Sequence, residues 1–305
     1  MSTTRVSDVL LLAVAVVWGS SYLTAKTLVV AGGVLVLLAL RFLVSAAAML
    51  PLLALRRPSR PEAGAGVLLG VTQASVLVLE TYGVSLTSAT NAGVLISLTV
   101  LLTPILEGLV LRRWLPRSFF LATITAFAGV VILVGGPGLR APSAGDALML
   151  AAAVVRAAHV TLSAHLTRGR SFHTATLTTL QTVTGAALFT IAAGPALLPA
   201  TAALRPGQWL GVLYLALGCS VFAFAAQLWA IRRTSAARAS LLLGTEPVWA
   251  VLCGVLLADD RLTAATLIGI LLVLGGTYAG QRVDRRVGRA AAPPSPTTGR
   301  VAVEG

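Results

Sequence analysis

Two apolar segments of this chain, residues 87–113 and 234–260, resemble each other, and this similarity limits the possible folds more than any other feature. The first reads TSATNAGVLISLTVLLTPILEGLVLRR and the second reads TSAARASLLLGTEPVWAVLCGVLLADD. Both begin with Thr-Ser-Ala, stay apolar for about one membrane thickness and contain one interior proline. The first ends in two arginines and the second in two aspartates. Because the flanking charge changes sign, the repeat predicts two copies inserted in the membrane in opposite orientations.

The amino-acid composition is that of a chain with many such segments. Hydrophobic residues make up 57% of the 305 residues and charged residues only 11%, and the mean hydropathy is +0.90. A soluble domain carries about a quarter charged residues. Because about 20 apolar residues cross the hydrocarbon core, the length allows about ten spans with short connections. The composition predicts an all-α membrane protein that has the lipid bilayer as a partner.

The net charge of +13 does not indicate a nucleic-acid partner. The basic residues form short clusters between apolar runs, without interleaved aromatic residues and without a soluble domain to present them. Lysine occurs once, at Lys26, and the other basic residues are arginines, which together with the excess of Ala, Val, Leu and Gly is typical of a GC-rich bacterial genome. We expect a multi-pass protein of the bacterial cell (inner) membrane.

Turn and charge signals divide the apolar sequence into ten predicted spans. A tail with three closely spaced prolines follows from Arg282 and is expected to be disordered. The predicted spans cover residues 8–28, 32–55, 66–86, 90–111, 118–136, 146–166, 173–194, 207–230, 236–257 and 263–281.

The arginines predict which ends of these spans face the cytoplasm. If the N-terminus is cytoplasmic, 17 arginines lie in inside segments and 3 lie in outside loops. The outside loops hold only Arg140, Arg205 and Arg261. This excess predicts that both termini are cytoplasmic.

The internal similarity extends over nearly the whole chain in the same order. LAVAVVW at 12–18 matches LAAAVVR at 150–156, and AGVVILVGG at 128–136 matches IGILLVLGG at 268–276. The glycines in the second match would permit close helix approach. Five spans are thus copied five spans later, and an odd number of spans inverts the second copy. We predict a five-helix repeat over 8–136, a second over 146–281 and a cytoplasmic tail over 282–305.

Three short motifs have the order and spacing of a known family. Span one contains Trp18-Gly19-Ser20-Ser21-Tyr22, span two contains Arg41-Phe42, and Thr234-Ser235-Ala236 leads to Glu246-Pro247-Val248. These resemble the WGS-aromatic, RF and TSA…EPV motifs of EamA-like domains in the drug/metabolite transporter superfamily, over about residues 8–281. The resemblance implies ten helices in two inverted repeats and transport of small organic solutes. Arg156 departs from the family pattern, because a neutral residue is usual there.

Ionisable side chains inside the predicted spans are candidates for function, because charge is costly within a bilayer. Arg156 and Glu246 lie near the middle of spans six and nine, whereas Arg41 and Glu80 lie toward the outer half. The remaining two are near span ends: Lys26 can extend to the interface, and Glu107 is close to Arg112.

Arg156 and Glu246 are predicted to hold a zwitterionic or amphipathic solute between the two repeats. Arginine binds a carboxylate through two hydrogen bonds, and a glutamate accepts hydrogen bonds from an ammonium group. Glu246 is also the candidate for the coupling proton, because burial favours its neutral form. The alternative is that Arg41–Glu80 and Arg156–Glu246 are buried ion pairs that only fix helix packing.

Other residues are predicted to contribute to the same site. Trp18 aligns with Arg156 in the repeat, and Trp18 and Tyr22 either line a cavity or lie at the membrane interface. His159 follows Arg156 by one helical turn and is a candidate for a proton relay. Span four contains Pro104 and span nine contains Pro247, and we expect each proline to kink its helix.

The sequence motifs favour a transporter over other membrane functions. No Gly-x4-Gly-Lys-Ser/Thr loop for ATP is present, so energy would come from a gradient or from exchange. An enzyme is not expected, because HExxH, GxSxG and clustered His/Asp sets are missing, and the two cysteines have no metal-site or disulfide spacing. No cofactor or metal is predicted. The leading interpretation is a secondary transporter, an exporter or exchanger of a small amphipathic metabolite such as an amino acid. The alternatives are an integral-membrane enzyme, a channel or a non-transporting membrane scaffold.

Overall fold

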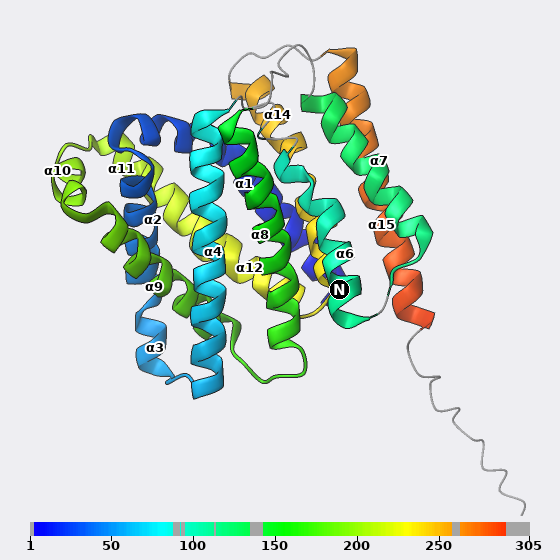
Figure 1. The fold of residues 1–305 in the computed structure, drawn as a ribbon, viewed down its shortest axis with the longest axis horizontal. Helices are drawn as coiled ribbons and strands as arrows, with labels where there is room; N and C mark the ends of the chain where they lie inside the picture. The colour runs from blue at the N-terminus through cyan, green and yellow to red at the C-terminus, as the bar shows by residue number, and fades with distance from the viewer. Residues whose placement is uncertain are drawn as a thin grey trace, which may run out of the picture.

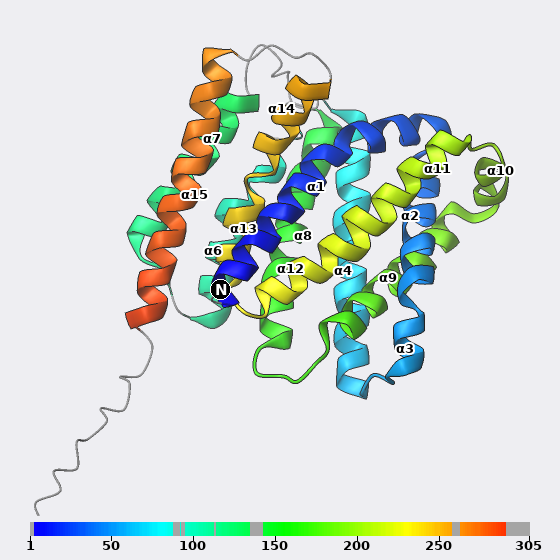
Figure 2. The same ribbon diagram turned by 180° about the vertical axis from the view of Figure 1, so that it is seen from behind.

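The computed structural model describes residues 3–87, 92, 95–112, 114–134, 143–257 and 263–290, and these form helices without any strand. Helices from the two halves of the chain intermingle in one bundle (Figures 1 and 2). In the first half the helices are α1 (Thr3–Gly32), α2 (Val34–Met49), α3 (Pro51–Leu55), α4 (Arg60–Leu86), α6 (Thr99–Leu111) and α7 (Arg117–Val134).

The second half begins at a capping box. The Ser143 side chain accepts a hydrogen bond from the backbone N–H of Asp146, and the Asp146 carboxylate accepts one from the N–H of Ser143. The helices that follow are α8 (Ala144–Thr167), α9 (Thr174–Ala193), η1 (Gly194–Ala196), α10 (Leu197–Ala202), α11 (Pro206–Leu213), η2 (Tyr214–Phe222), α12 (Ala223–Ile231), α13 (Ala236–Leu243), α14 (Glu246–Leu257) and α15 (Ala264–Ala290).

Seven of the described helical segments are long and apolar enough to cross a membrane. Two further apolar helices are shorter, at Leu95–Val110 and Arg117–Ile132. The chain is therefore an all-helical protein with several membrane spans. At its C-terminal end, α15 continues to Ala290, so residues 282–290 are helical where we expected the disordered tail to begin, and the rest of that tail lies outside the described residues.

The ninth predicted span is broken rather than kinked. Helix α13 ends at Leu243, a turn at Gly244 and Thr245 follows, and Pro247 is the second residue of α14. A proline in the first turn of a helix removes no hydrogen bond, because those N–H groups have no partner within the helix. Pro104, in contrast, lies inside α6, which continues from Thr99 to Leu111.

The fourth predicted span has a single turn residue at the matching place in the repeat. Residues 95–97 are helical, Leu98 forms a turn with helical dihedral angles, and α6 begins at Thr99. Thr99 is the residue that aligns with Glu246, where α14 begins. The fourth span is therefore locally irregular at the position where the ninth span is broken.

The main helix contacts between the two halves follow the repeat: each joins equivalent helices or has an equivalent contact when the halves are interchanged. Helix α7 packs along α15, and α2 packs along α9, so each of these contacts joins equivalent helices. The contact of α4 with α8 corresponds to that of α12 with α1, and the contact of α6 with α8 corresponds to that of α14 with α1. Figures 1 and 2 show α7 and α15 side by side at one edge of the bundle. The two halves therefore use the same surfaces to contact each other.

Glycine allows α7 and α15 to approach at backbone distance. A Cβ atom added to Gly129 would lie 2.6 Å from the backbone nitrogen of Val273, and one added to Gly276 would lie 2.6 Å from that of Ala126. Such distances cannot be relieved by moving a flexible side chain. Close packing of this kind is the main source of helix association in a bilayer, because lipid tails are as apolar as the helix surfaces.

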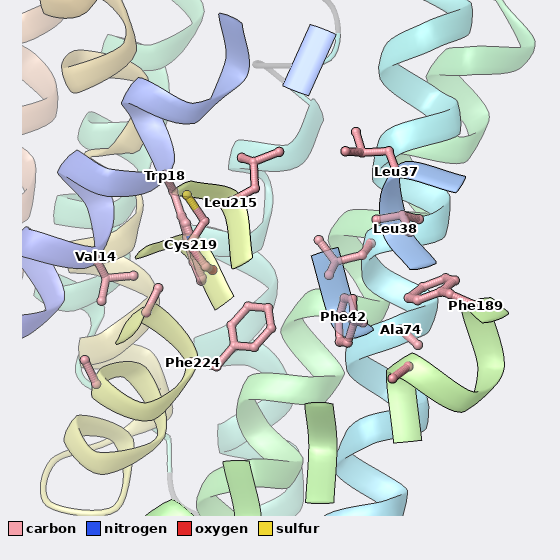
Figure 3. Close-up of a cluster of buried hydrophobic side chains, with 14 of the residues drawn as sticks. Val14, Trp18, Leu37, Leu38, Phe42, Ala74, Phe189, Leu215, Cys219 and Phe224 are labelled. Carbon is pink, nitrogen blue, oxygen red and sulfur yellow. The ribbon is translucent and has the colours of Figure 1, made fainter. Parts of the chain in front are cut away.

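Aromatic rings fill the core between α1, α2, α9 and α12 (Figure 3). The Phe42 ring lies 5.2 Å from that of Phe189 and 6.2 Å from that of Phe224, and the Trp18 ring lies 6.3 Å from that of Phe224. These centroid distances are favourable for tilted and edge-to-face ring contacts. The core thus fixes the position of Trp18 on α1, and the candidate site lies next to it.

Candidate functional site

Arg156 of α8 lies between two carboxylates from different helices. Its Nη2 is 3.3 Å from Oε2 of Glu80 on α4, and its Nη1 is 3.6 Å from Oε2 of Glu246 on α14. The guanidinium carbon also lies 5.2 Å from the ring centroid of Trp18, within cation–π range. We call Arg156, Glu80, Glu246 and Trp18 the Arg156 cluster. It joins four helices, α1, α4, α8 and α14.

The side chains of this cluster are largely withdrawn from the surface. The exposed fraction is 17% for Arg156, 12% for Glu80 and 7% for Glu246. Arg156 is near the middle of α8, and Glu246 is near the middle of the α13–α14 pair. Charges in such a position are expensive unless each has a partner.

One oxygen of the cluster lacks a hydrogen bond. Glu80 Oε2 is buried and is close to Arg156, but no described residue donates a hydrogen bond to it. Burying a carboxylate oxygen without a hydrogen-bond donor is unfavourable. A donor group of a ligand, or a proton on the carboxylate, would remove this cost.

Local chain geometry places Glu246 against α1. Glu246 is the first residue of α14, where a negative charge is favoured by the helix dipole. A Cβ atom added to Gly19 would lie 2.7 Å from the carbonyl oxygen of Glu246 and 2.9 Å from the nitrogen of Ala250. Glycine at this position therefore allows α1 to contact the start of α14, next to Trp18.

Arg41 bonds to η2, and not to Glu80 as the alternative of an Arg41–Glu80 ion pair suggested. Its Nε donates to Ser220 Oγ at 2.7 Å, and its Nη2 donates to the carbonyl oxygen of Cys219 at 3.0 Å. Trp18 Nε1 donates to the same carbonyl at 3.0 Å. Glu80 pairs with Arg156 instead. Thus the Arg156–Glu246 contact is present, and the Arg41–Glu80 pair is not among the ion pairs of the described residues.

The shared carbonyl of Cys219 lies in a widened helix. Residues Tyr214–Phe222 form a π-helix, in which each N–H bonds five residues back instead of four. Ser220 also donates to the carbonyl of Leu215, at 3.3 Å. π-helical segments often occur at functional sites, because they redirect backbone groups. In this protein the Cys219 carbonyl connects Arg41 on α2 with Trp18 of the Arg156 cluster.

His159 contacts α4 and not the carboxylates of the cluster. Its Nδ1 is 2.7 Å from Thr72 Oγ1, and the side chain is buried. Thr72 and Glu80 are about two turns apart on α4, so His159 and Arg156 face the same helix at different depths. The side chain of Tyr22, also predicted at the site, lies outside the described part of the structure.

A second buried charge network was not expected from the sequence. Arg238 on α13 donates to both carboxylate oxygens of Asp8 on α1, at 2.9 and 2.8 Å, and to Asp284 on α15, at 3.0 Å. Glu107 of α6, interpreted above as lying near Arg112, is buried and accepts hydrogen bonds from the N–H groups of Ala236 and Ala237 at the start of α13. The sequence shows that these charged residues lie near span ends, but not which of them meet.

No part of the described structure offers a metal centre. Groups of three or more His, Cys, Asp or Glu side chains that could hold a metal ion are not found among the described residues. The Arg156 cluster instead combines one guanidinium with two carboxylates and an aromatic face. This chemistry suits an organic zwitterion or an organic cation.

Comparison with known proteins identifies the family. The model of the EamA-like transporter family matches this chain twice, over residues 5–135 and 143–279. The chain belongs to the EamA-like transporter family. Its sequence is 26% identical over 269 residues to an uncharacterized transporter of Archaeoglobus fulgidus, which covers 88% of this chain and 83% of that protein.

A solved crystal structure has the same fold as this EamA-like protein. The two superpose with a TM-score of 0.75 at 20% sequence identity, over 92% of this chain and 98% of the other. The family and the relative are transporters by name, not enzymes. The protein is therefore a multi-pass membrane protein of a transporter family, with two EamA repeats.

Proposed function

We propose that this protein is a secondary transporter, an exporter or exchanger of a small zwitterionic or amphipathic metabolite such as an amino acid, in the bacterial inner membrane. The observation that carries the proposal is the position of Arg156 between Glu80 and Glu246, with Glu80 Oε2 lacking a donor. A solute carboxylate would bind the guanidinium of Arg156, and a solute ammonium would donate to the two glutamates. Trp18 would contact the apolar part of the solute.

Proton coupling follows from the same cluster. Two carboxylates share one guanidinium there, so a proton on one carboxylate would leave a neutral pair. Glu246 is the candidate for this proton because it lies at the break between α13 and α14, where a small helix movement would change its distance from Arg156. A solute ammonium and a proton would then compete for the same oxygens, which is the requirement for exchange.

The proposed transport cycle is alternating access between two inverted five-helix repeats, with ten spans and both termini in the cytoplasm. Paired helix contacts and the turns at the equivalent positions Leu98 and Gly244–Thr245 support a two-fold relation between the halves. The 17-to-3 distribution of arginines supports the orientation. In this arrangement the Arg156 cluster would be the binding site near mid-membrane, and the halves would rock around it.

The test is flux of labelled amino acids and related solutes into proteoliposomes that contain the purified protein. We expect Arg156→Gln and Glu246→Gln to lower transport by about 10- to 100-fold, as expected for loss of a charged hydrogen bond to the solute. Both variants should still insert and keep their helical circular dichroism. Absence of flux for every solute of the panel would contradict the proposed substrate class.

A triple variant separates binding from packing, because Arg156 pairs with both Glu80 and Glu246. If the three charges are only structural, each single change destabilises the protein, and the neutral set Glu80→Gln, Arg156→Gln, Glu246→Gln restores transport. Wild-type transport by this triple variant would show that none of these charges belongs to the solute site. Ser45→Ala is the matched control, because Ser45 is a buried polar residue that bonds within the α2 and η2 contact, away from the Arg156 cluster.

A further inference from the structure

A basic pocket lies at one end of the bundle, apart from the Arg156 cluster. It has a volume of about 630 Å³ and lies between the loop that joins α8 to α9 and the turn that joins α12 to α13. Figure 1 shows the first of these, the loop after α8, at the lower edge of the bundle. The residues that characterise its lining are Arg170, Arg232, Arg233, His173, Trp229 and Phe172.

Aromatic rings and neutral oxygen atoms contact three guanidinium groups of the pocket. The guanidinium carbon of Arg233 lies 3.9 Å from the ring centroid of Trp229, and that of Arg170 lies 5.4 Å from the ring centroid of Phe172. Arg232 donates to Thr174 Oγ1 at 2.9 Å and to the carbonyl oxygen of Arg170 at 3.2 Å. None of the three is part of an ion pair in the part of the chain that the structure describes.

The nearby acid forms its ion pair with a different arginine. The buried carboxylate of Glu62 pairs with Arg56 at 3.1 Å and accepts a hydrogen bond from the backbone N–H of His173 at 2.7 Å. Burial lowers the pKa of Arg232, the charge of Arg233 lowers it further, and Glu62 acts in the opposite direction. The pocket thus keeps a positive potential that an anion would relieve.

We propose that this pocket binds a phosphoryl group, presented either by the headgroup of an anionic phospholipid or by a soluble phosphate ester. Guanidinium groups match phosphate oxygens with paired hydrogen bonds. The volume lies in the usual range for small-molecule sites and leaves room for a glycerol unit beside the phosphate.

The position of the pocket makes both sources accessible. The candidate spans Ala144–Thr167, Thr174–Ala202 and Pro206–Ile231 begin or end at its edge, so it lies at a membrane boundary. The arginine distribution predicts that this boundary is cytoplasmic, where anionic headgroups attract basic residues. The proposal does not depend on the solute that the Arg156 cluster binds.

The test uses the purified full chain in neutral detergent micelles, titrated with three probes. These are short-chain phosphatidylglycerol, short-chain phosphatidylcholine and glycerol phosphate, and binding is followed by tryptophan fluorescence, since Trp229 lines the pocket. We expect saturable binding of phosphatidylglycerol, of glycerol phosphate, or of both. Binding of the lipid alone assigns the site to a headgroup, and binding of glycerol phosphate assigns it to a soluble ester.

Paired variants distinguish the pocket from general surface charge. Arg170→Gln, Arg233→Gln removes two exposed guanidiniums whose side chains contact only aromatic rings or their own helix, so the fold should be kept. We expect it to weaken binding by about 10- to 30-fold, since each basic residue near a membrane surface contributes on the order of 1 kcal/mol to anion binding. Arg232 is left unchanged because it holds the loop.

The control is Arg282→Gln, Arg286→Gln on α15. It removes the same charge and includes an arginine over an aromatic ring, with Arg282 4.6 Å from the ring centroid of Tyr278. We expect this control to bind like the wild-type protein. The proposal is overturned if no probe binds, if phosphatidylcholine binds as tightly as phosphatidylglycerol, or if both double variants lose the same affinity.

Discussion

Replacing Arg238 by methionine should be among the most damaging single changes in this protein. Arg238 is 1% exposed, donates two hydrogen bonds of 2.8 and 2.9 Å to Asp8 and donates one of 3.0 Å to Asp284. Methionine has a similar volume and removes the charge, so the packing volume is largely kept while two carboxylates lose their shared partner. Breaking a buried ion pair in this way costs about 3–5 kcal/mol. We therefore expect Arg238→Met to lower the free energy of unfolding by about that amount.

The assay is equilibrium unfolding by sodium dodecyl sulfate in mixed micelles, followed by circular dichroism. Arg233→Met is the control, because Arg233 is exposed and has its cation–π contact and its hydrogen bond with Trp229, and its change should be within about 0.5 kcal/mol of the wild type. The triple variant Asp8→Asn, Arg238→Met, Asp284→Asn should recover at least about half of the loss, since it no longer buries unpaired charge. An Arg238→Met variant as stable as Arg233→Met would refute the reasoning.

Two further predictions concern packing and orientation. Gly129→Ala should lower the free energy of unfolding by about 1–3 kcal/mol, because the added Cβ meets the backbone of α15, whereas Gly64→Ala on the open side of α4 should not destabilise, and the same detergent titration compares them. Alkaline phosphatase fused after Gly305 should be inactive in cells, because the arginine distribution predicts a cytoplasmic C-terminus, and an active fusion would show that the orientation is wrong.

The pairing of charges shows how far sequence reasoning extends. The positions of Arg156 and Glu246 within their predicted spans indicated that they lie at similar depth, and the structure places them 3.6 Å apart. The sequence also left open a pair between Arg41 and Glu80, which is not among the ion pairs of the described residues. Glu80 forms an ion pair with Arg156 because α4 packs against α8, and Arg41 donates to the backbone of η2 because α2 packs there.

The helix breaks show the same limit. Pro247 signalled an interruption in the ninth span, but a proline is compatible with a kink, a break or the first turn of a helix. The structure has a break, with α13 ending at Leu243 and α14 beginning at Glu246. In the fourth span the turn lies at Leu98, six residues before Pro104, so the proline gives no indication of its position.

By itself, the sequence determined the properties that depend on one segment at a time. Hydropathy and length decide whether a segment is a membrane helix, and the motifs WGS, RF, TSA and EPV indicate the family, because these are read along the chain. The family model matches the same two halves that the internal similarity relates.

Only the tertiary structure decided which side chains meet across helices. Asp8 and Arg238 are 230 residues apart in the chain, and Trp18 and Cys219 are 201 apart, yet each pair is in hydrogen-bond contact. Such contacts depend on which faces of two helices pack together and at what relative shift. A displacement of one residue turns a side chain by about 100° around its helix and removes it from its partner.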